Sequence, residues 1–245
     1  MDTDGYFDKA VADRYDDPLD EMFSPVVIAA TVDFLLEESR SGDALEFGIG
    51  TGRIALPLSD RGVTVAGIDL SQAMVDQLAK KPGANSIEVT RGDFAASRAK
   101  GTFSMVYLVF NTIMNLTTQA EQVACFRNAA AHLEPGGRFV VEVMVPDLQR
   151  LPPGQTGVVF RSDASGWGID EYDVAIQGLT SHHLDIDGDK VTYASMPFRY
   201  VWPAELDLMA ELAGMSLVHR YGGWDRSPFD ADSRQHISVW EKSVG

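Results

Sequence analysis

Short apolar segments alternate with segments of helical periodicity between residues 43 and 145. Strands are predicted at residues 44–47, 63–69, 86–90, 103–110 and 138–145. Helices are predicted at residues 53–59, 71–79 and 121–133, with Pro135-Gly136-Gly137 ending the last of them. Strands that alternate with helices at this spacing form right-handed crossover units, so the pattern predicts a mostly parallel sheet.

The pattern changes after Pro146. Residues 150–200 contain strand-like pieces separated by turn sequences at 164–166 and 187–189, which predict antiparallel hairpins laid over one end of the sheet. A helix at 203–213 and strands at 215–221 and 235–241 return to the first pattern. The predicted fold class is α/β: a mostly parallel seven-stranded sheet with helices on both faces and a small antiparallel cap insertion.

The first 23 residues are acidic, yet Tyr6, Phe7, Val11 and Tyr15 recur at roughly helical spacing. This spacing predicts a short amphipathic helix that packs on the rest of the molecule, and a frayed terminus is the alternative. Ser24-Pro25 then predicts the start of a longer helix, because proline is favoured at the first helical position.

Charge narrows the choice of partners. The chain has 20 Lys and Arg against 36 Asp and Glu, a net charge of −16, so nucleic acid and anionic membrane surfaces are not expected to bind. The one cysteine, Cys125, suits a reducing compartment. We find no secretory signal and no apolar run near the roughly 20 residues that span a bilayer. A cytoplasmic location is expected.

The segment Leu45 to Gly52 carries the most chemical information, because it places Gly48, Gly50 and Gly52 directly after the first predicted strand. Ligands of open α/β sheets bind at the carboxyl ends of the strands, and glycine lets the backbone approach them closely. The segment does not fit the dinucleotide fingerprint, which would need glycine or alanine where Arg53 stands. It suits a nucleoside joined to an amino acid better than a pyrophosphate.

Two acidic residues follow the next two strands. Asp69 lies after Gly48 at about the 20-residue spacing of a carboxylate that accepts hydrogen bonds from a ribose diol. In the run Gly92-Asp93-Phe94, the carboxylate could accept from an adenine amino group while the ring of Phe94 packs nearby. The alternatives are a helix-capping role for Asp69 and a loop role for Asp93.

These motifs resemble the class I S-adenosylmethionine-dependent methyltransferases, which share a Rossmann-like fold. The similar motifs are Leu45–Gly52, Gly67–Ser71, Gly92–Phe94 and Leu133–Phe139, in the family's order and separation. The resemblance implies S-adenosylmethionine as cofactor, Glu46 near its methionine end, and Phe110 and Asn111 beside the methionine tail and the acceptor. The expected cofactor-binding residues are Glu46, Gly48, Gly50, Gly52, Asp69, Leu70, Gly92, Asp93, Phe94 and Phe110.

Methyl transfer from a sulfonium mainly requires positioning of the acceptor behind the methyl group, and a base only if the nucleophile carries a proton. No metal is required. His182, His183 and Tyr15 are the catalytic candidates, although a packing role suits Tyr15 as well. The candidate substrate-binding residues are Tyr6, Asn111, Arg199 and Trp224, of which Arg199 and Trp224 would equally suit a surface or rim position.

The sequence therefore predicts methyl transfer to a nitrogen or oxygen of a small metabolite or natural product. An NAD-dependent oxidoreductase and a non-catalytic cofactor-binding protein are the alternatives. We expect four parts: a helical lid at 1–40, the cofactor-binding core at 41–146, the cap at 147–202 and the completion of the sheet at 203–245. A monomer and a homodimer are both compatible with the sequence.

Overall fold

A seven-stranded sheet forms the centre of the molecule. The structure, a computed structural model, describes residues 6–16 and 24–244. The strand order is β10-β11-β5-β4-β1-β2-β3. The strands are β1 (Ala44–Phe47), β2 (Val65–Asp69), β3 (Glu88–Arg91), β4 (Phe103–Leu108), β5 (Leu133–Met144), β10 (Met215–Tyr221) and β11 (Gln235–Lys242). The first five pair in parallel, whereas β11 is antiparallel to both of its neighbours, which confirms the predicted fold class.

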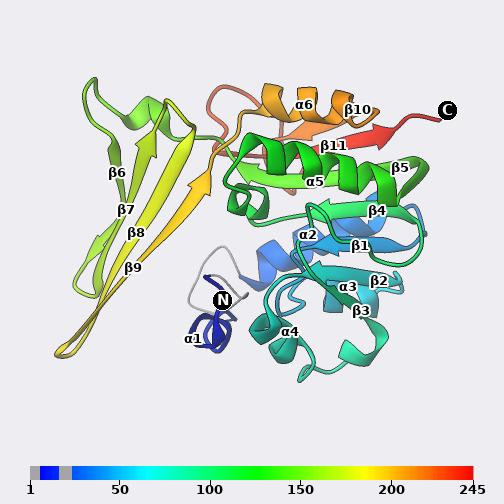
Figure 1. The fold of residues 1–245 in the computed structure, drawn as a ribbon, viewed down its shortest axis with the longest axis horizontal. Coiled ribbons are helices and arrows are strands. Elements are labelled where there is room, and N and C mark those ends of the chain that lie inside the picture. The colour runs from blue at the N-terminus through cyan, green and yellow to red at the C-terminus, as the bar shows by residue number, and fades with distance from the viewer. Residues whose placement is uncertain (1–5, 17–23, 245) are drawn as a thin grey trace.

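Helices cover both faces of this sheet (Figure 1). On one face, α2 (Pro25–Glu38), α3 (Ala55–Asp60) and α4 (Gln72–Leu78) contribute to one apolar cluster. On the other face, α5 (Gln119–His132) and α6 (Pro203–Leu212) contribute to a second cluster. The central strands are buried on both faces, as their continuous apolar sequence requires.

Side-chain caps fix where the helices begin. The Ser24 hydroxyl accepts from the Val27 N–H at the start of α2, and Ser71 does the same for Met74 at the start of α4. Thr118 begins α5 with a reciprocal capping box. These caps satisfy backbone N–H groups that have no partner within the helix, and they fix the residue at which each helix begins.

Two sequence expectations need correction. The helix expected at 121–133 ends at His132, and the strand expected to begin at Arg138 begins at Leu133, which pairs with Phe103. The Leu133 side chain is buried, so the chain enters the sheet early, and the glycines lie in an irregularity within β5. In the N-terminal segment, the helix α1 (Lys9–Ala12) is only four residues long. Tyr6 and Tyr15 lie outside it.

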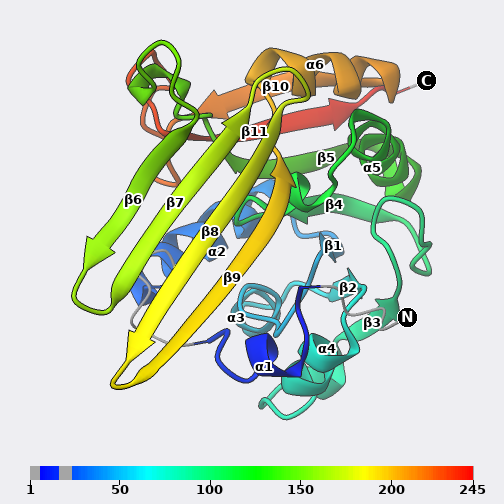
Figure 2. The ribbon, with the colours of Figure 1, turned by 60° about the vertical axis from the view of Figure 1, so that its left-hand side comes forward.

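A second sheet lies beyond the carboxyl ends of the parallel strands (Figure 2). Its strands β6 (Gly157–Asp163), β7 (Gly166–Asp173), β8 (Gly178–Asp187) and β9 (Lys190–Arg199) pair antiparallel in chain order. Val158, Tyr172 and Leu179 anchor one face of this sheet in the cluster that contains α5. The edge strand β9 contacts the short 3-10 helix η3 (Thr112–Asn115) that follows β4.

A buried polar cluster joins this second sheet to the core. Arg199, at the end of β9, is 4% exposed and forms an ion pair of 2.7 Å with Glu205 at the start of α6. The same guanidinium donates to the side-chain oxygens of Gln122 and Gln177. The cluster connects β9, α5 and α6, so both terminal nitrogens of the guanidinium are engaged in structural contacts.

We expect Arg199→Ala to destabilise the protein by about 3 kcal/mol, because it leaves the carboxylate of Glu205 without its cation in a largely buried site. Urea unfolding followed by circular dichroism would measure this loss. The matched control is Arg150→Ala, which breaks an exposed ion pair to Asp147 and should cost less than about 1 kcal/mol. Equal losses in the two variants would contradict a special role for the buried cluster.

Candidate functional site

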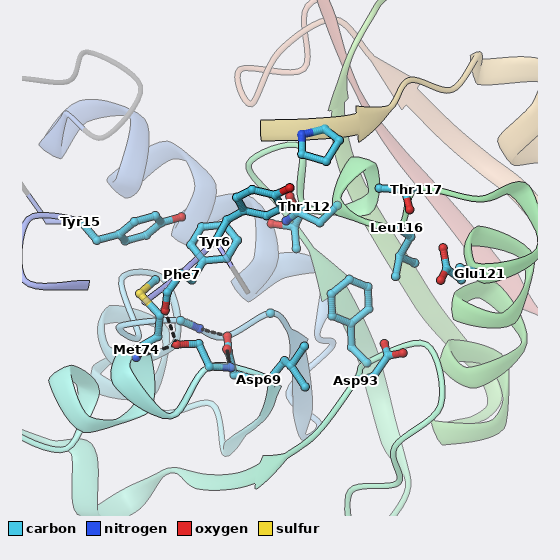
Figure 3. A pocket seen from close by; sticks show the side chains of 17 residues that line it. Tyr6, Phe7, Tyr15, Asp69, Met74, Asp93, Thr112, Leu116, Thr117 and Glu121 are labelled. Carbon is cyan, nitrogen blue, oxygen red and sulfur yellow. Dashed lines mark hydrogen bonds between the residues drawn. The ribbon is translucent and has the colours of Figure 1, made fainter. Parts of the chain in front are cut away.

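A cavity of about 300 Å³ opens where four neighbouring parallel strands end (Figure 3). Residues following β1, β2, β3 and β4 form its floor, and the segment 6–16 covers it. Its lining residues are Tyr6, Phe7, Tyr15, Gly48, Gly50, Asp69, Leu70, Ser71, Met74, Asp93, Phe94, Thr112, Asn115, Leu116, Thr117, Glu121 and Pro197. The cavity thus lies where open α/β sheets bind their ligands.

The glycine loop forms one wall of the cavity. Gly48, Gly50 and Gly52 have φ angles of 68°, 53° and 74°, a conformation that side chains disfavour. A Cβ on Gly48 would lie 2.7 Å from the Thr112 methyl group, and one on Gly52 would lie 2.3 Å from Leu78. Gly48 and Gly50 line the cavity, whereas Gly52 allows α4 to pack closely against the loop.

Asp69 is held in position by the backbone on both sides. Its Oδ2 accepts from the Gly50 N–H at 2.7 Å, and its Oδ1 accepts from the Ser71 N–H at 2.8 Å. The residue is 9% exposed and lines the cavity. A carboxylate oxygen has two lone pairs, so an oxygen that accepts from a backbone N–H can also accept from a ligand hydroxyl group.

Asp93 and its neighbours form the adjoining part of the wall. The Asp93 Oδ1 accepts from the Ala95 N–H at 2.8 Å, which fixes the carboxylate at the cavity. The ring of Phe94 stacks on Phe47 with 5.8 Å between centroids. Leu70, which is 47% exposed, lines the same cavity. Gly92 does not line it, but a Cβ there would collide with Ser97.

Glu46 lies on β1 and is fully buried behind the cavity wall. Its Oε2 accepts from the Tyr107 hydroxyl at 2.9 Å. Burial raises the pKa of Glu46 to about 8; the Tyr107 hydrogen bond lowers it, and the nearby charge of Asp69 raises it further. The carboxyl group is therefore largely protonated at neutral pH until a cation approaches it.

The N-terminal segment is bonded to the glycine loop and to α4. Asp16 accepts from the Thr51 hydroxyl at 2.7 Å and forms an ion pair of 2.6 Å with Lys81. The Ser71 hydroxyl donates to the Phe7 carbonyl at 2.6 Å (Figure 3). Burial raises the pKa of Tyr15, so its hydroxyl stays protonated at neutral pH. The segment is thus positioned to enclose a ligand.

Several lining residues were not identified from the sequence. Thr112, Asn115, Leu116 and Thr117 follow β4 and belong to η3 or the turn after it. The rule that ligands bind at the carboxyl ends of strands could have found them, because β4 ends only a few residues earlier. Pro197 had no local signal, since it reaches the cavity only through the packing of β9 against η3.

Other sequence candidates lie away from the cavity. Arg199 is buried in the polar cluster with Glu205, and Trp224 packs edge-to-face on Phe34 of α2. Both histidines lie on the cap sheet: His182 pairs with the Tyr193 hydroxyl at 2.7 Å, and His183 contacts Ser181 at 3.1 Å. None of these four residues is among the residues that line the cavity.

Phe110 and Asn111 form the turn between β4 and the lining residue Thr112. The ring of Phe110 lies 5.8 Å from the Arg53 guanidinium, which also lies 4.7 Å from the ring centroid of Tyr15. The Asn111 side chain accepts from the Met144 N–H at 2.7 Å. Both residues therefore lie beside the cavity wall, although the side chains that line the space belong to their neighbours.

Known proteins that are similar to this chain include methyltransferases. A family described as a methyltransferase domain matches residues 44–137. The solved structure of the CcbJ methyltransferase from Streptomyces caelestis is 36% identical and superimposes with a TM-score of 0.85, covering 96% of both chains. Cypemycin N-terminal methyltransferase from a Streptomyces species is 29% identical over 81% of this chain and 82% of its own.

A third relative is similar over a shorter region. It is the dTDP-3-amino-3,6-dideoxy-alpha-D-glucopyranose N,N-dimethyltransferase of Streptomyces fradiae, 32% identical over 42% of this chain and 40% of its own. The cavity at the strand ends, the glycine loop and the nearly full-length similarity to CcbJ agree with one another. The chain therefore belongs to the class I S-adenosylmethionine-dependent methyltransferases.

Proposed function

We propose that the enzyme methylates an amine nitrogen of a small-molecule acceptor. The observation that carries this proposal is the charge of the cavity. Asp69, Asp93 and Glu121 line it, and none of its described lining residues is Lys, Arg or His. An acidic cavity in a chain of net charge −16 attracts cations, and amines are cationic in water. Two relatives are named for methylation of an amine: one at a peptide N-terminus and one on an amino sugar.

The residues around the cavity fit the cofactor. We assign the ribose hydroxyls to Asp69, the adenine ring to Leu70, Asp93 and Phe94, and the methionine end to the side where Tyr15 and Glu46 lie. Gly48 and Gly50 let the backbone approach without a Cβ, while Gly52, Gly92 and Phe110 shape the wall from behind. When bound, S-adenosylmethionine supplies a methyl group on a positively charged sulfur.

The acceptor is assigned to the region where three segments meet. Tyr6 comes from the N-terminal segment, Thr112 from η3 and Pro197 from β9, and all three line the cavity. Figure 3 places Tyr6 and Thr112 between Tyr15 on one side and Asp93 on the other. Side chains from three segments restrict the shape and orientation of an acceptor, which is the main requirement of this reaction.

The proton chemistry follows from the same residues. With its raised pKa, the Tyr15 hydroxyl stays protonated at neutral pH and does not act as a base. His182 and His183 do not line the cavity. We therefore propose that the carboxylates attract the ammonium form to the entrance of the cavity, where its proton passes to solvent. The amine is then enclosed and reacts in its neutral form, so that no side-chain base is needed.

We also propose the cellular setting and the division of the chain. Within the described part of the chain, no helix is long and apolar enough to cross a membrane. The acidic charge favours a small acceptor over nucleic acid or a membrane surface, and the single cysteine suits the cytoplasm. We assign the role of a lid to the segment 1–40, through residues 6–16 that cover the cavity, while its helix α2 packs on the sheet. We assign cofactor binding to the core at 41–146, the role of a cap to 147–202 and completion of the sheet to 203–245.

Matched acceptors test the proposed function. We would supply S-adenosylmethionine with a nucleotide amino sugar and its hydroxyl counterpart, and with a peptide before and after acetylation of its N-terminus. We expect S-adenosylhomocysteine release and a methylated product, detected by mass spectrometry, only with the compounds that carry a free amine. Methylation of the hydroxyl counterparts alone would contradict an amine acceptor.

Asp69→Ala should weaken binding of S-adenosylmethionine by about 1.5–3 kcal/mol, the range for losing hydrogen bonds to a charged group. Isothermal titration calorimetry would measure this affinity. Asp76→Ala is the matched control, because Asp76 is an exposed carboxylate on the neighbouring α4. Unchanged affinity in a folded Asp69 variant would remove the ribose assignment.

Glu46 should make the stability of the ligand-free enzyme depend on pH. Between pH values of about 4.5 and 8, the folded protein holds a proton at Glu46 that the unfolded chain releases. Stability therefore falls as the pH rises through this window. Glu46→Gln should flatten the fall by about 1–3 kcal/mol between pH 5.5 and 8.5, measured by urea unfolding. Parallel curves for the variant and the wild type would contradict the raised pKa.

A further inference from the structure

The turn after β4 is held in an unusual backbone conformation. Phe110 and Asn111 have φ angles of 55° and 59°, although neither is glycine. The side chain of Phe110 disfavours this conformation, which asparagine adopts more readily. Two consecutive residues in this region persist only when the surrounding structure holds them there. The turn lies directly before Thr112, a residue of the cavity wall.

Strand β5 supplies the contacts that hold the turn. The Oε2 of Glu142 accepts from the Phe110 N–H at 2.8 Å. Two residues further along β5, the Met144 N–H donates to the Asn111 side chain at 2.7 Å. Glu142 is 6% exposed, and the indole of Trp224 lies beside its carboxyl group. Burial raises the pKa of Glu142, while the Phe110 N–H and Trp224 lower it.

The turn sets the position of two parts of the site. Directly after the turn, the methyl group of Thr112 lies so close to Gly48 that a Cβ on Gly48 would be 2.7 Å from it. Within the turn, the ring centroid of Phe110 lies 5.8 Å from the Arg53 guanidinium, which contacts Tyr15. A change in the turn would therefore shift Thr112 against the glycine loop and Phe110 against the residues behind Tyr15.

We propose that Glu142 is a positioning residue of the cofactor site. Glu142 is not among the residues that line the cavity. It acts through Phe110, by holding the left-handed turn that places Thr112 on the glycine loop. What this role requires of residue 142 is an oxygen that accepts from the Phe110 N–H, which the amide of glutamine also provides.

Two substitutions at this position separate positioning from bulk stability. We expect Glu142→Ala to weaken S-adenosylhomocysteine binding by about tenfold, the equivalent of one lost hydrogen bond of positioning. Hydrogen exchange of the Phe110 amide, followed by mass spectrometry of a peptide that contains it, should become at least several-fold faster. Glu142→Gln should restore both the affinity and the slow exchange.

Glu38→Ala is the matched control. Glu38 is also a buried carboxylate, 5% exposed, and it pairs with Arg138, which precedes Glu142 by four residues on β5. Its loss should lower the unfolding temperature but leave S-adenosylhomocysteine affinity and Phe110 exchange unchanged. The ligand in these measurements is S-adenosylhomocysteine alone, so the result does not depend on the proposed amine acceptor.

Two results would overturn the proposal. One is wild-type affinity and wild-type Phe110 exchange in Glu142→Ala. The other is a Glu142→Gln variant that is as impaired as Glu142→Ala, since the accepted hydrogen bond would then not be what matters. If Glu142→Ala does not fold, Glu142→Gln still tests the proposal, because it must bind S-adenosylhomocysteine as the wild type does.

Discussion

The rest of the cavity depends on the two backbone hydrogen bonds that the Asp69 carboxylate accepts. One oxygen binds the backbone of the glycine loop after β1, and the other binds the start of α4 after β2. Ser71, whose N–H makes the second of these contacts, also donates its hydroxyl to the carbonyl of Phe7 in the segment that covers the cavity. A single side chain thus fixes two loops of the core, and its neighbour attaches the segment that closes the cavity. A rigid carboxylate loses little entropy when it accepts hydrogen bonds from a ligand.

The acidic groups around the site repel one another, and a bound cation would reduce this repulsion. Asp69 and Glu46 are both buried, and their mutual repulsion adds to the burial that keeps Glu46 protonated. Among the described residues, the charge of Arg53 opposes this effect, yet burial dominates. An arriving ammonium or sulfonium group favours the charged form of nearby carboxylates. The site is therefore arranged so that a positive ligand relieves a charge distribution that the protein alone leaves unfavourable.

The sequence predicted the core well because its signals are local. Glycines after a strand, a carboxylate at the end of the next strand and helix caps such as Ser71 depend on residues within a few positions of one another. The part of the cavity that we assign to the acceptor was predicted poorly, because it is built from contacts distant in the chain. Pro197 reaches the cavity through β9, and Arg199, a plausible acceptor ligand by sequence, is occupied by Glu205 and two glutamines. No hydrophobic periodicity or sequence motif predicts these long-range contacts.

The turn at Gly48 and the turn at Phe110 and Asn111 both have left-handed backbone, and the residue after the second turn packs on the first. They use different residue types for a physical reason. At Gly48 the backbone itself must lie against its neighbours, so glycine is required: a Cβ would collide with the Thr112 methyl group. At Phe110 and Asn111 the side chains are themselves in use, one beside Arg53 and one on the backbone of Met144. Glycine would remove those contacts, so the second turn keeps its strain, and contacts from β5 must offset it. The buried Glu142 is the side chain that the strand provides for this purpose.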